Sequence, residues 1–330
     1  MELIITDAIG NEKGYLQCTS VDIENGERND FEIVLNRKNY NKEIYSPGCR
    51  IFAPGTEWGG VINTIHPSGE LLYLNGPTWR GRLDKSVVEP DEGEDYLTLT
   101  GDVHTVMRQV LKRQGLTELF RVPQTLAGVT VANYSFPRYY SVLEGFLSML
   151  RPLGMKLVIK YIRGPANDIG YVQLQASKIR DYSDQVEIGN DMQIRYDIKV
   201  DHGIPNHLIC LGSGELKDRL VIHLYRNRYG QIVEQPYYTG MEKIDAVYES
   251  SAESDADKLR SDGIKRFEEL IQSVTAKAYI TVTDRINVDI GDIVSGRERI
   301  TGIKVRVPVV RKVYTRNGRE EIFDYKLKGE

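Results

Sequence analysis

The histidines are the first residues to weigh for chemistry, because imidazole titrates near neutrality and is the commonest metal ligand in proteins. His202 and His207 are close together beside Asp201, a spacing that a metal site could use, but no third ligand is predicted near them. The chain also lacks the GxSxG, HExxH and Walker patterns of common catalytic and nucleotide sites. We therefore expect no metal, no cofactor and no catalytic set. The histidines are expected in surface and core roles: His66, His104, His202, His207 and His223.

Carboxylates gather in two short stretches of the chain. Two carboxylates across a cleft are what a glycoside hydrolase needs, so either stretch could serve an enzyme that acts on cell-wall glycan. Both stretches are polar and turn-like or lie at the start of a helix, and a solvated loop or a favourable charge at a helix N-terminus accounts for them. We favour a protein that is not an enzyme and keep the hydrolase as an alternative. The two stretches contain Glu89, Asp91, Glu92, Glu94 and Asp95, and Glu253, Asp255 and Asp257.

Basic residues recur near the C-terminus. Lys304 and Arg306 share one face of an alternating strand. Such a face could meet an acidic partner, or line a channel through which nucleic acid passes transiently. The other interpretation is an exposed sheet face whose charge prevents edge-to-edge aggregation. The recurring residues are Arg297, Arg299, Lys304, Arg306, Arg311, Lys312, Arg316 and Arg319.

The aromatic residues are mostly tyrosine, with 20 Tyr against 7 Phe and 2 Trp. Tyrosine has an apolar body and a polar tip and suits half-buried sheets and subunit interfaces, which favours an assembling protein. A carbohydrate-binding module, in which Trp58, Trp79 and the tyrosines would stack on sugars, is a further alternative. Two tryptophans are few for that role.

Composition narrows the class of protein further. The 330 residues suggest two or more domains, and 47 Asp+Glu against 43 Lys+Arg exclude a dedicated surface for duplex DNA. A hydrophobic content of 41% supports packed cores, and no apolar run is long enough to span a bilayer, so no membrane association is expected. The N-terminus has no signal-peptide pattern. Cys18, Cys49 and Cys210 lack CxxC spacing, so we expect reduced core thiols.

The pattern of apolar residues predicts an α+β chain that is mainly β. Short strands fill the first hundred residues, and two helices follow, one capped by Asp102 and stopped by Gly115 and one over about 140–150. Strands are expected at 156–162 and 171–176, and again over 185–238. A capping box of Ser250 and Glu253 predicts a further helix, and Asn317-Gly318 predicts a hairpin near the end.

These elements suggest four domains. We expect a barrel-like β domain over 1–100, a small α+β domain over 101–180, a second barrel-like β domain over 181–249, and a helix-plus-hairpin domain over 250–330. The two β regions are expected to superpose on each other.

The order of segments along the chain resembles that of siphophage tail-hub proteins, also called tail-tip or baseplate hubs. The resemblance covers nearly the whole chain in four stretches. The segments that carry it are Asn29–Leu35, Tyr45-Ser46-Pro47-Gly48, Ile51-Phe52, Trp58–Ile62, Leu74–Gly81, Asp289–Val294, Ile300–Val305 and the Asn317-Gly318 hairpin.

The resemblance implies a structural protein of the virion tail, made in the cytoplasm of a bacterial host and encoded by a phage, a prophage or a phage-tail-like bacteriocin. Such hubs are homotrimers in which two barrel-like domains per chain make a pseudo-sixfold ring. The ring would continue the tail tube, or meet distal tail proteins, on one side and hold a spike or fibre on the other. Some relatives carry a peptidoglycan-cleaving domain after the hub, and the position of the hairpin near Glu330 leaves no room for one here.

Overall fold

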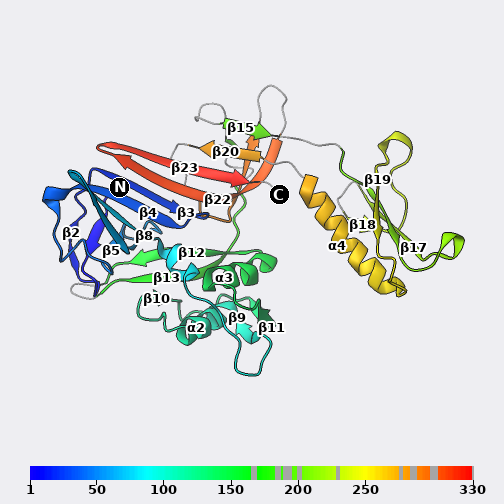
Figure 1. Ribbon diagram of the computed structural model, residues 1–330, viewed down its shortest axis with the longest axis horizontal. Coiled ribbons are helices and arrows are strands. Elements are labelled where there is room, and N and C mark those ends of the chain that lie inside the picture. Colours follow the sequence, from blue (N-terminus) through cyan, green and yellow to red (C-terminus); the bar gives the residue numbers. More distant parts are fainter. Residues whose placement is uncertain are drawn as a thin grey trace. The chain divides into compact units, whose positions relative to one another are not determined.

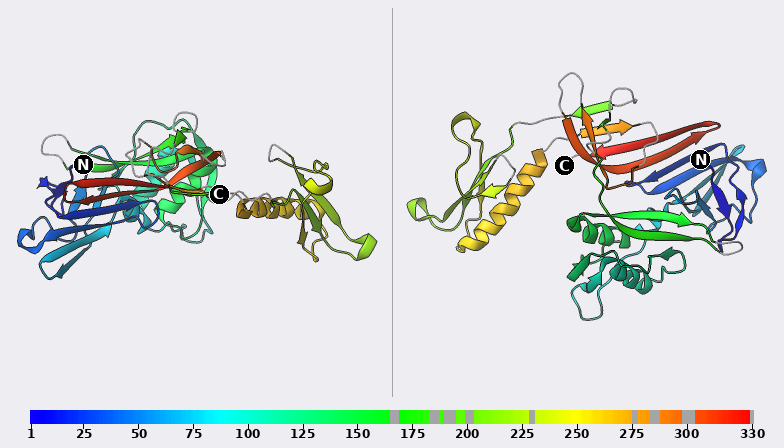
Figure 2. Two further views of the ribbon diagram at one scale, coloured as in Figure 1. Left: turned by 90° about the horizontal axis from the view of Figure 1, so that it is seen from above. Right: turned by 180° about the vertical axis from the view of Figure 1, so that it is seen from behind.

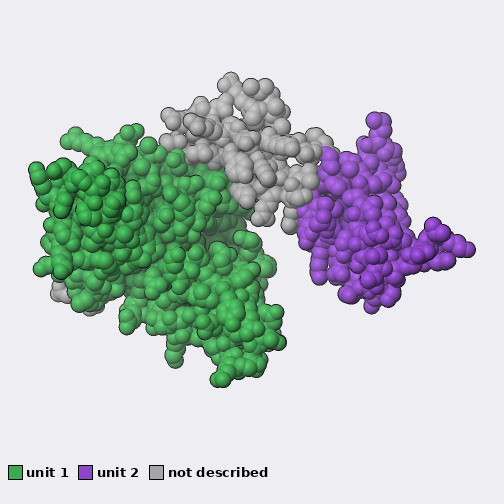
Figure 3. Space-filling view, viewed as in Figure 1, with its two compact units in different colours: residues 1–196, 280–328 green, residues 197–279, 329–330 purple. Residues whose placement is uncertain are grey.

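The computed structural model describes residues 1–164, 169–182, 187–188, 195–198, 203–227, 231–274, 278–282, 288–297 and 304–328. It is mainly β, as the sequence predicts. The chain forms two compact units (Figure 3). The first unit holds Met1–Tyr196 and Ile280–Lys328, and the second unit holds Asp197–Tyr279.

The largest sheet of the first unit joins the two ends of the sequence. Strands β3 (Ser20–Asn25), β4 (Asp30–Asn36), β8 (Leu71–Pro77) and β7 (Thr64–Ser68) pair in that order, each antiparallel to the next. The C-terminal hairpin of β22 (Lys304–Asn317) and β23 (Glu320–Lys328) continues this sheet, because β22 pairs with β3 (Figure 1). The predicted hairpin is present: Asn317 pairs with Glu320, and Gly318, with a φ of +59°, and Arg319 form the turn between them.

Smaller strands complete the β part of the first unit. A second sheet has the order β2 (Glu12–Tyr15), β1 (Ile4–Thr6), β5 (Arg50–Phe52) and β6 (Gly59–Val61). Strand β21 (Ile293–Arg297) pairs with β22 and with β14 (Glu187–Ile188). Strands β15 (Arg195–Ile198) and β20 (Ala278–Val282) lie where the sequence passes from one unit to the other. Helix α1 (Trp79–Asp84) follows β8, and a 3-10 turn (Arg37–Asn39) follows β4.

Residues 97–178 of the first unit form a group of helices and strands that we call the α+β module. Its elements are β9 (Leu97–Asp102), α2 (Val103–Arg113), β10 (Phe120–Arg121), β11 (Thr130–Phe136), α3 (Val142–Leu150), a 3-10 turn (Arg151–Leu153), β12 (Met155–Ile162) and β13 (Tyr171–Lys178).

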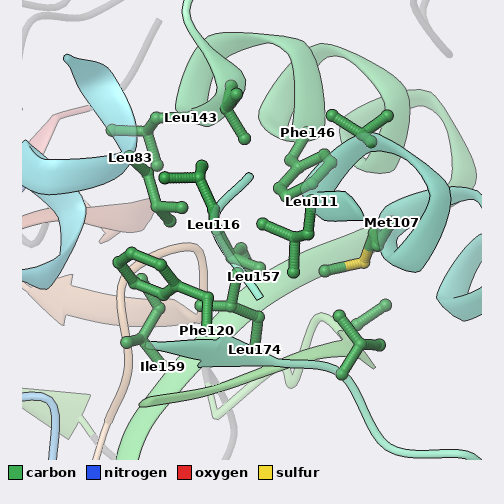
Figure 4. Packing of buried hydrophobic residues seen from close by; sticks show 14 of the residues in the cluster. Leu83, Met107, Leu111, Leu116, Phe120, Leu143, Phe146, Leu157, Ile159 and Leu174 are labelled. Atoms are coloured by element: carbon green, nitrogen blue, oxygen red, sulfur yellow. The ribbon is translucent and has the colours of Figure 1, made fainter. Parts of the chain in front are cut away.

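Local signals in the sequence set the boundaries of this module. Asp102 caps α2 by accepting the backbone N–H of His104 at 2.9 Å, and Ser141 caps α3 in the same way through Glu144. The two helices bury their apolar faces against β12 and β13, and Figure 4 shows side chains of all four elements meeting in one core. A short sheet of β10, β13 and β12 and a pair of β9 with β11 frame this core.

The second unit is a four-stranded sheet with one covering helix (Figure 2). The order is β18 (Ile232–Val233), β17 (Val221–Arg226), β16 (His207–Leu211) and β19 (Asp245–Glu249), with β16 and β19 parallel. Helix α4 (Ala256–Val274) packs its Leu259 and Phe267 on one face of this sheet. Two 3-10 turns lie at Leu216–Asp218 and Gly240–Glu242.

The start of α4 corrects a prediction. Asp255, and not the expected box of Ser250 and Glu253, accepts the first free N–H groups, from Asp257 at 2.8 Å and Lys258 at 3.2 Å. The helix therefore begins at Ala256, several residues later than the Ser250 signal indicated.

The expected barrels are not seen. Among the described residues the sheets are open, and the first β region is antiparallel whereas the second contains the parallel pair β16–β19. The described parts of 1–100 and 181–249 therefore do not share one topology. The second sheet hides one apolar face beneath α4, so it need not close on itself to bury that face.

The grouping of elements also differs from the four expected domains. The helix and the hairpin expected together over 250–330 belong to different units. Helix α4 packs on β16 and β17, because its apolar face needs a sheet to cover, whereas β22 and β23 extend the N-terminal sheet through backbone pairing.

Candidate functional site: a buried ion-pair network

A network of buried ion pairs links distant stretches of the first unit. Glu57, in the turn before β6, accepts the Nε–H of Arg80 from α1 at 3.2 Å and lies 2.9 Å from Nζ of Lys312 in β22. The three side chains are almost completely buried, with exposed fractions of 6%, 3% and 9%. Arg80 also donates to the backbone carbonyl of Leu157 in β12. One carboxylate thus holds together the N-terminal sheet, the α+β module and the C-terminal hairpin.

Lys156 of β12 forms the second half of the network. Its Nζ donates to Asp292 at 2.6 Å and to Asp289 at 3.1 Å, in the turn before β21. Asp292 is 1% exposed and also accepts the backbone N–H groups of Arg180 and Asp289, each at 2.9 Å. The two halves meet where Asp289 lies 3.7 Å from Nζ of Lys312.

The charges in this network stabilise one another. Burial favours the neutral form of Glu57, but Lys312 and Arg80 outweigh burial and hold its pKa below the ordinary value. Burial likewise opposes the charge of Lys312, and Glu57 outweighs it and raises the pKa of Lys312. The network balances three cations against three carboxylates: Arg80, Lys156 and Lys312 against Glu57, Asp289 and Asp292. Each of these side chains pairs with a side chain of opposite charge, so the network is better suited to holding the segments of the first unit together than to catalysis.

A polar cavity of about 370 Å³ lies beside the network, within the first unit. Lys160 and Arg180 add two cations to its wall, and Arg180 donates to the hydroxyl of Tyr182 at 3.2 Å. In the parts of the chain that the structure describes, no three His, Cys, Asp or Glu side chains gather in a way that could hold a metal.

The described histidines have structural partners. His104 in α2 donates from Nδ1 to the carbonyl of Thr125 at 2.8 Å and accepts the N–H of Ala176 at 3.1 Å, so it bridges the helix to β13. His207 lies between Asp245 at 2.5 Å and His223 at 2.9 Å.

The remaining histidines are His66 and His202. His66 lies beside the ring of Tyr73. His202, the other half of the suggested metal spacing, lies outside the described residues.

The two acidic stretches belong to different units, 89–95 to the first and 253–257 to the second. All five carboxylates of the 89–95 loop are exposed, and Asp91 pairs with Arg113 of α2 at 2.5 Å. In the other stretch Asp255 caps α4, and Glu253 pairs with Lys258, a contact that lowers the pKa of Glu253. These positions match a solvated loop and a helix start.

The tryptophans are unsuited to stacking on sugars. Trp58 is 6% exposed and Trp79 is completely buried. Trp79 stacks on Tyr161 inside the core, and Trp58 contacts Tyr314. Both side chains are buried in the first unit and contact other aromatic rings, so they do not form the exposed pair of stacking platforms that a carbohydrate-binding module would need.

The C-terminal basic residues are only partly a surface feature. Lys312 belongs to the buried network, and Arg311 pairs with the buried Glu24 at 2.8 Å. β22 has neighbours on both sides here, so it is no sheet edge. The side chains of Lys304 and Arg306 lie outside the described residues.

Comparison with known proteins identifies the fold. The structure is similar to the 43 kDa tail protein of prophage MuSo2 from Shewanella oneidensis, at 12% identity and a TM-score of 0.57, with 99% of this chain and 97% of that chain covered. A prophage tail protein from Listeria monocytogenes matches at 12% identity and a TM-score of 0.55, with 100% and 95% covered. A chain of the phage P2 virion baseplate in its activated conformation matches at 10% identity and a TM-score of 0.52, with 100% and 99% covered.

These similarities define a class. The chain has the fold of phage tail and baseplate proteins, and the resemblance noted in the sequence is confirmed at the level of the fold. No family model matches the sequence, and no curated protein matches it. None of the helices in the described part of the chain combines the length and apolar character needed to cross a bilayer.

Proposed function

We propose that the protein is a structural hub of a phage or phage-like tail, which joins the tail tube to the tip as a homotrimeric ring. The observation that carries this proposal is the extent of the structural similarity. It runs through 99% of this chain and 97% of the Shewanella prophage tail protein, so both units and the α+β module are shared with a tail protein. A closed cyclic trimer would place three copies of the chain around the axis of a tail.

The partners follow from that position. One side of the ring would contact the tail tube or distal tail proteins, and the other a spike or fibre, so the protein would reside in the virion tail. DNA would pass at most transiently through the channel, since a net charge of −4 does not favour a static complex with nucleic acid. We propose no membrane contact.

We also propose that the hub is not an enzyme. The exposed 89–95 loop supports this view, because its five carboxylates are open to solvent and all come from one short segment. Replacing Glu89, Glu92 or Asp95 by Ala should leave assembly intact and change stability by less than about 0.5 kcal/mol. Cleavage of purified peptidoglycan by the chain, lost in one of these variants, would establish the hydrolase instead.

The proposal is tested by counting copies in an assembled tail. The chain is produced together with its neighbouring tail proteins, and the particle is imaged at a resolution that places subunits around the tube axis. Three copies around that axis are expected. Six copies, or one, would refute the trimeric ring.

A further inference from the structure

A second hollow of the first unit has a different character from the network. It has a volume of about 550 Å³ and lies on the α+β module between the end of α2, the 117–124 segment and the start of β13. We call it the α2 groove. Its lining is Arg108, Leu111, Lys112, Thr117, Phe120, Arg121, Val122, Pro123, Gln124, Tyr171 and Gln173.

The floor of the α2 groove is apolar and fixed in place. Leu111 and Phe120 are buried in the core of the module, as Figure 4 shows, so the floor is part of a packed structure. Arg108 donates to the carbonyl of Pro123 and, at 2.8 Å, to the hydroxyl of Thr105. This side chain ties one wall of the groove to α2. The groove is therefore formed before any ligand arrives, which lowers the cost of binding.

The rim of the α2 groove is positive. Lys112 of α2 and Arg121 of β10 are both exposed, and the guanidinium of Arg121 lies 4.6 Å above the ring of Tyr171. No carboxylate belongs to the lining, and none of the described residues forms an ion pair with Arg108, Lys112 or Arg121.

One wall also offers a sheet edge. β10 is the outer strand of the sheet ordered β10-β13-β12, and within the described residues it pairs only with β13. The backbone N–H of Phe120 already donates to the carbonyl of Leu116 at 2.9 Å, so an extended segment in the groove would be held mainly by its side chains, on the apolar floor and at the rim.

We propose that the α2 groove is a docking site for an extended segment of another protein, in which a large apolar residue is flanked by aspartate or glutamate. The apolar side chain fills the hollow above Leu111 and Phe120. The flanking carboxylates meet Lys112 and Arg121. Charge complementarity selects this occupant over a basic or purely apolar segment. The site does not depend on how many copies of the chain a tail contains.

The test uses the full chain and a library of random linear peptides displayed on phage. Selection is expected to enrich peptides with one large apolar residue and carboxylates on both sides. An enriched peptide is then labelled and its affinity measured by fluorescence anisotropy. Affinity should fall as salt rises, because the rim contacts are exposed ion pairs.

Variants locate the binding on the groove. Lys112→Glu combined with Arg121→Glu should weaken binding by at least about tenfold. Gln173→Trp, which fills the hollow without changing charge, should abolish it. Lys178→Glu is the control for a single charge reversal and is compared with Lys112→Glu alone, since it lies at the far end of β13 and should leave affinity unchanged. Thermal unfolding of each variant checks that the chain is folded.

Several results would overturn the proposal. These are no enrichment of acidic–apolar peptides, equal binding by the double charge variant, or equal loss with Lys178→Glu. A peptide of residues 89–97, the acidic loop of this same chain, is included as a competitor. If it binds in the groove as tightly as the selected peptides and the chain self-associates through it, the occupant is a second copy and not another protein.

Discussion

Replacing Glu57 by Gln is the sharpest test of how the first unit is held together. The substitution keeps the shape of the side chain and one acceptor oxygen but removes the charge that faces Arg80 at 3.2 Å and Lys312 at 2.9 Å. Both cations stay buried. Lys312 keeps only Asp289, at 3.7 Å, as an opposite charge. The variant therefore leaves buried positive charge without adequate compensation, the costliest kind of electrostatic error in a protein interior.

The expected loss of stability follows from that burial. Removing one partner of a buried pair costs about 3–5 kcal/mol. For a unit of this size each kcal/mol lowers the unfolding temperature by about 2–4 °C, so we expect a shift of about 10 °C. Adding Lys312→Met should recover part of the loss, since it removes one of the two uncompensated cations, and the coupling between the two sites should be about 1–3 kcal/mol.

Tryptophan fluorescence is a suitable assay because both tryptophans, Trp58 and Trp79, belong to the first unit. The second unit contributes no tryptophan signal, so the transition that is followed is that of the unit carrying the network.

Glu27→Gln is the matched control. Glu27 also faces two cations, Arg311 at 3.5 Å and Lys326 at 3.3 Å, but it is 58% exposed. Exposed pairs are worth about 0–1 kcal/mol, so this variant should unfold close to the wild type. If Glu57→Gln lowers the free energy of unfolding by no more than Glu27→Gln does, the ion-pair network does not hold the first unit together as its geometry indicates.

Three further outcomes are expected. The difference in unfolding free energy between the wild type and Glu57→Gln should be largest above about pH 5. It should shrink as the pH falls below 4.5, the ordinary pKa of a glutamate, because the lowered pKa of Glu57 means that only its ionised form stabilises the fold. Denaturant titrations at several pH values measure this difference, and a difference that grows toward acid pH would contradict the expectation. Asp102→Ala removes the acceptor of three backbone N–H groups, one at the start of α2 and two in the loop that faces it. The free energy of unfolding, followed by tryptophan fluorescence, should fall by about 2–3 kcal/mol. A fall of less than about 0.5 kcal/mol would show that the fold does not depend on this cap. Gly263→Ala would place a Cβ 2.4 Å from Sγ of Cys210. The melting temperature of the second unit, measured by circular dichroism, should therefore fall despite the better helix propensity of Ala, and adding Cys210→Ala should raise it again. An unchanged melting temperature would mean that α4 can shift to make room for the methyl group.

Local signals predicted the α+β module well. Asp102 and Ser141 each precede an apolar period of helical spacing, and the caps hold in the structure. Caps and periods act over a few residues, so they can be read from a single stretch of sequence.

Pairing between distant strands was beyond such signals. The alternation of β22 indicates a strand, but nothing in its own residues says that Lys312 will lie opposite Asn25 of β3. The same limit explains why the helix and the hairpin of 250–330 were placed in one domain. The alternation of a strand shows which of its faces is buried, but it does not show which other strand will pair with it.

The ion-pair network was missed for a related reason. Glu57, Lys156 and Asp292 are separated by about a hundred residues or more, and each one taken alone resembles an ordinary surface charge. One signal was available, since Lys156 follows the turn at Gly154 and interrupts the apolar start of β12. Charged residues inside an apolar run are buried only when they are paired, so this position pointed to a partner without naming it.

The balance of charge separates the two candidate sites by role. In the network, Lys156 and Lys312 are buried, and each has carboxylates within 4 Å. At the α2 groove, Lys112 and Arg121 are exposed beside an apolar floor with no carboxylate in the lining. Charges that are matched internally contribute to the fold of one chain, whereas exposed cations at a preformed apolar hollow are free to pair with carboxylates of another molecule. In a protein with the fold of phage tail and baseplate proteins, the groove is the place where we expect that other molecule to bind.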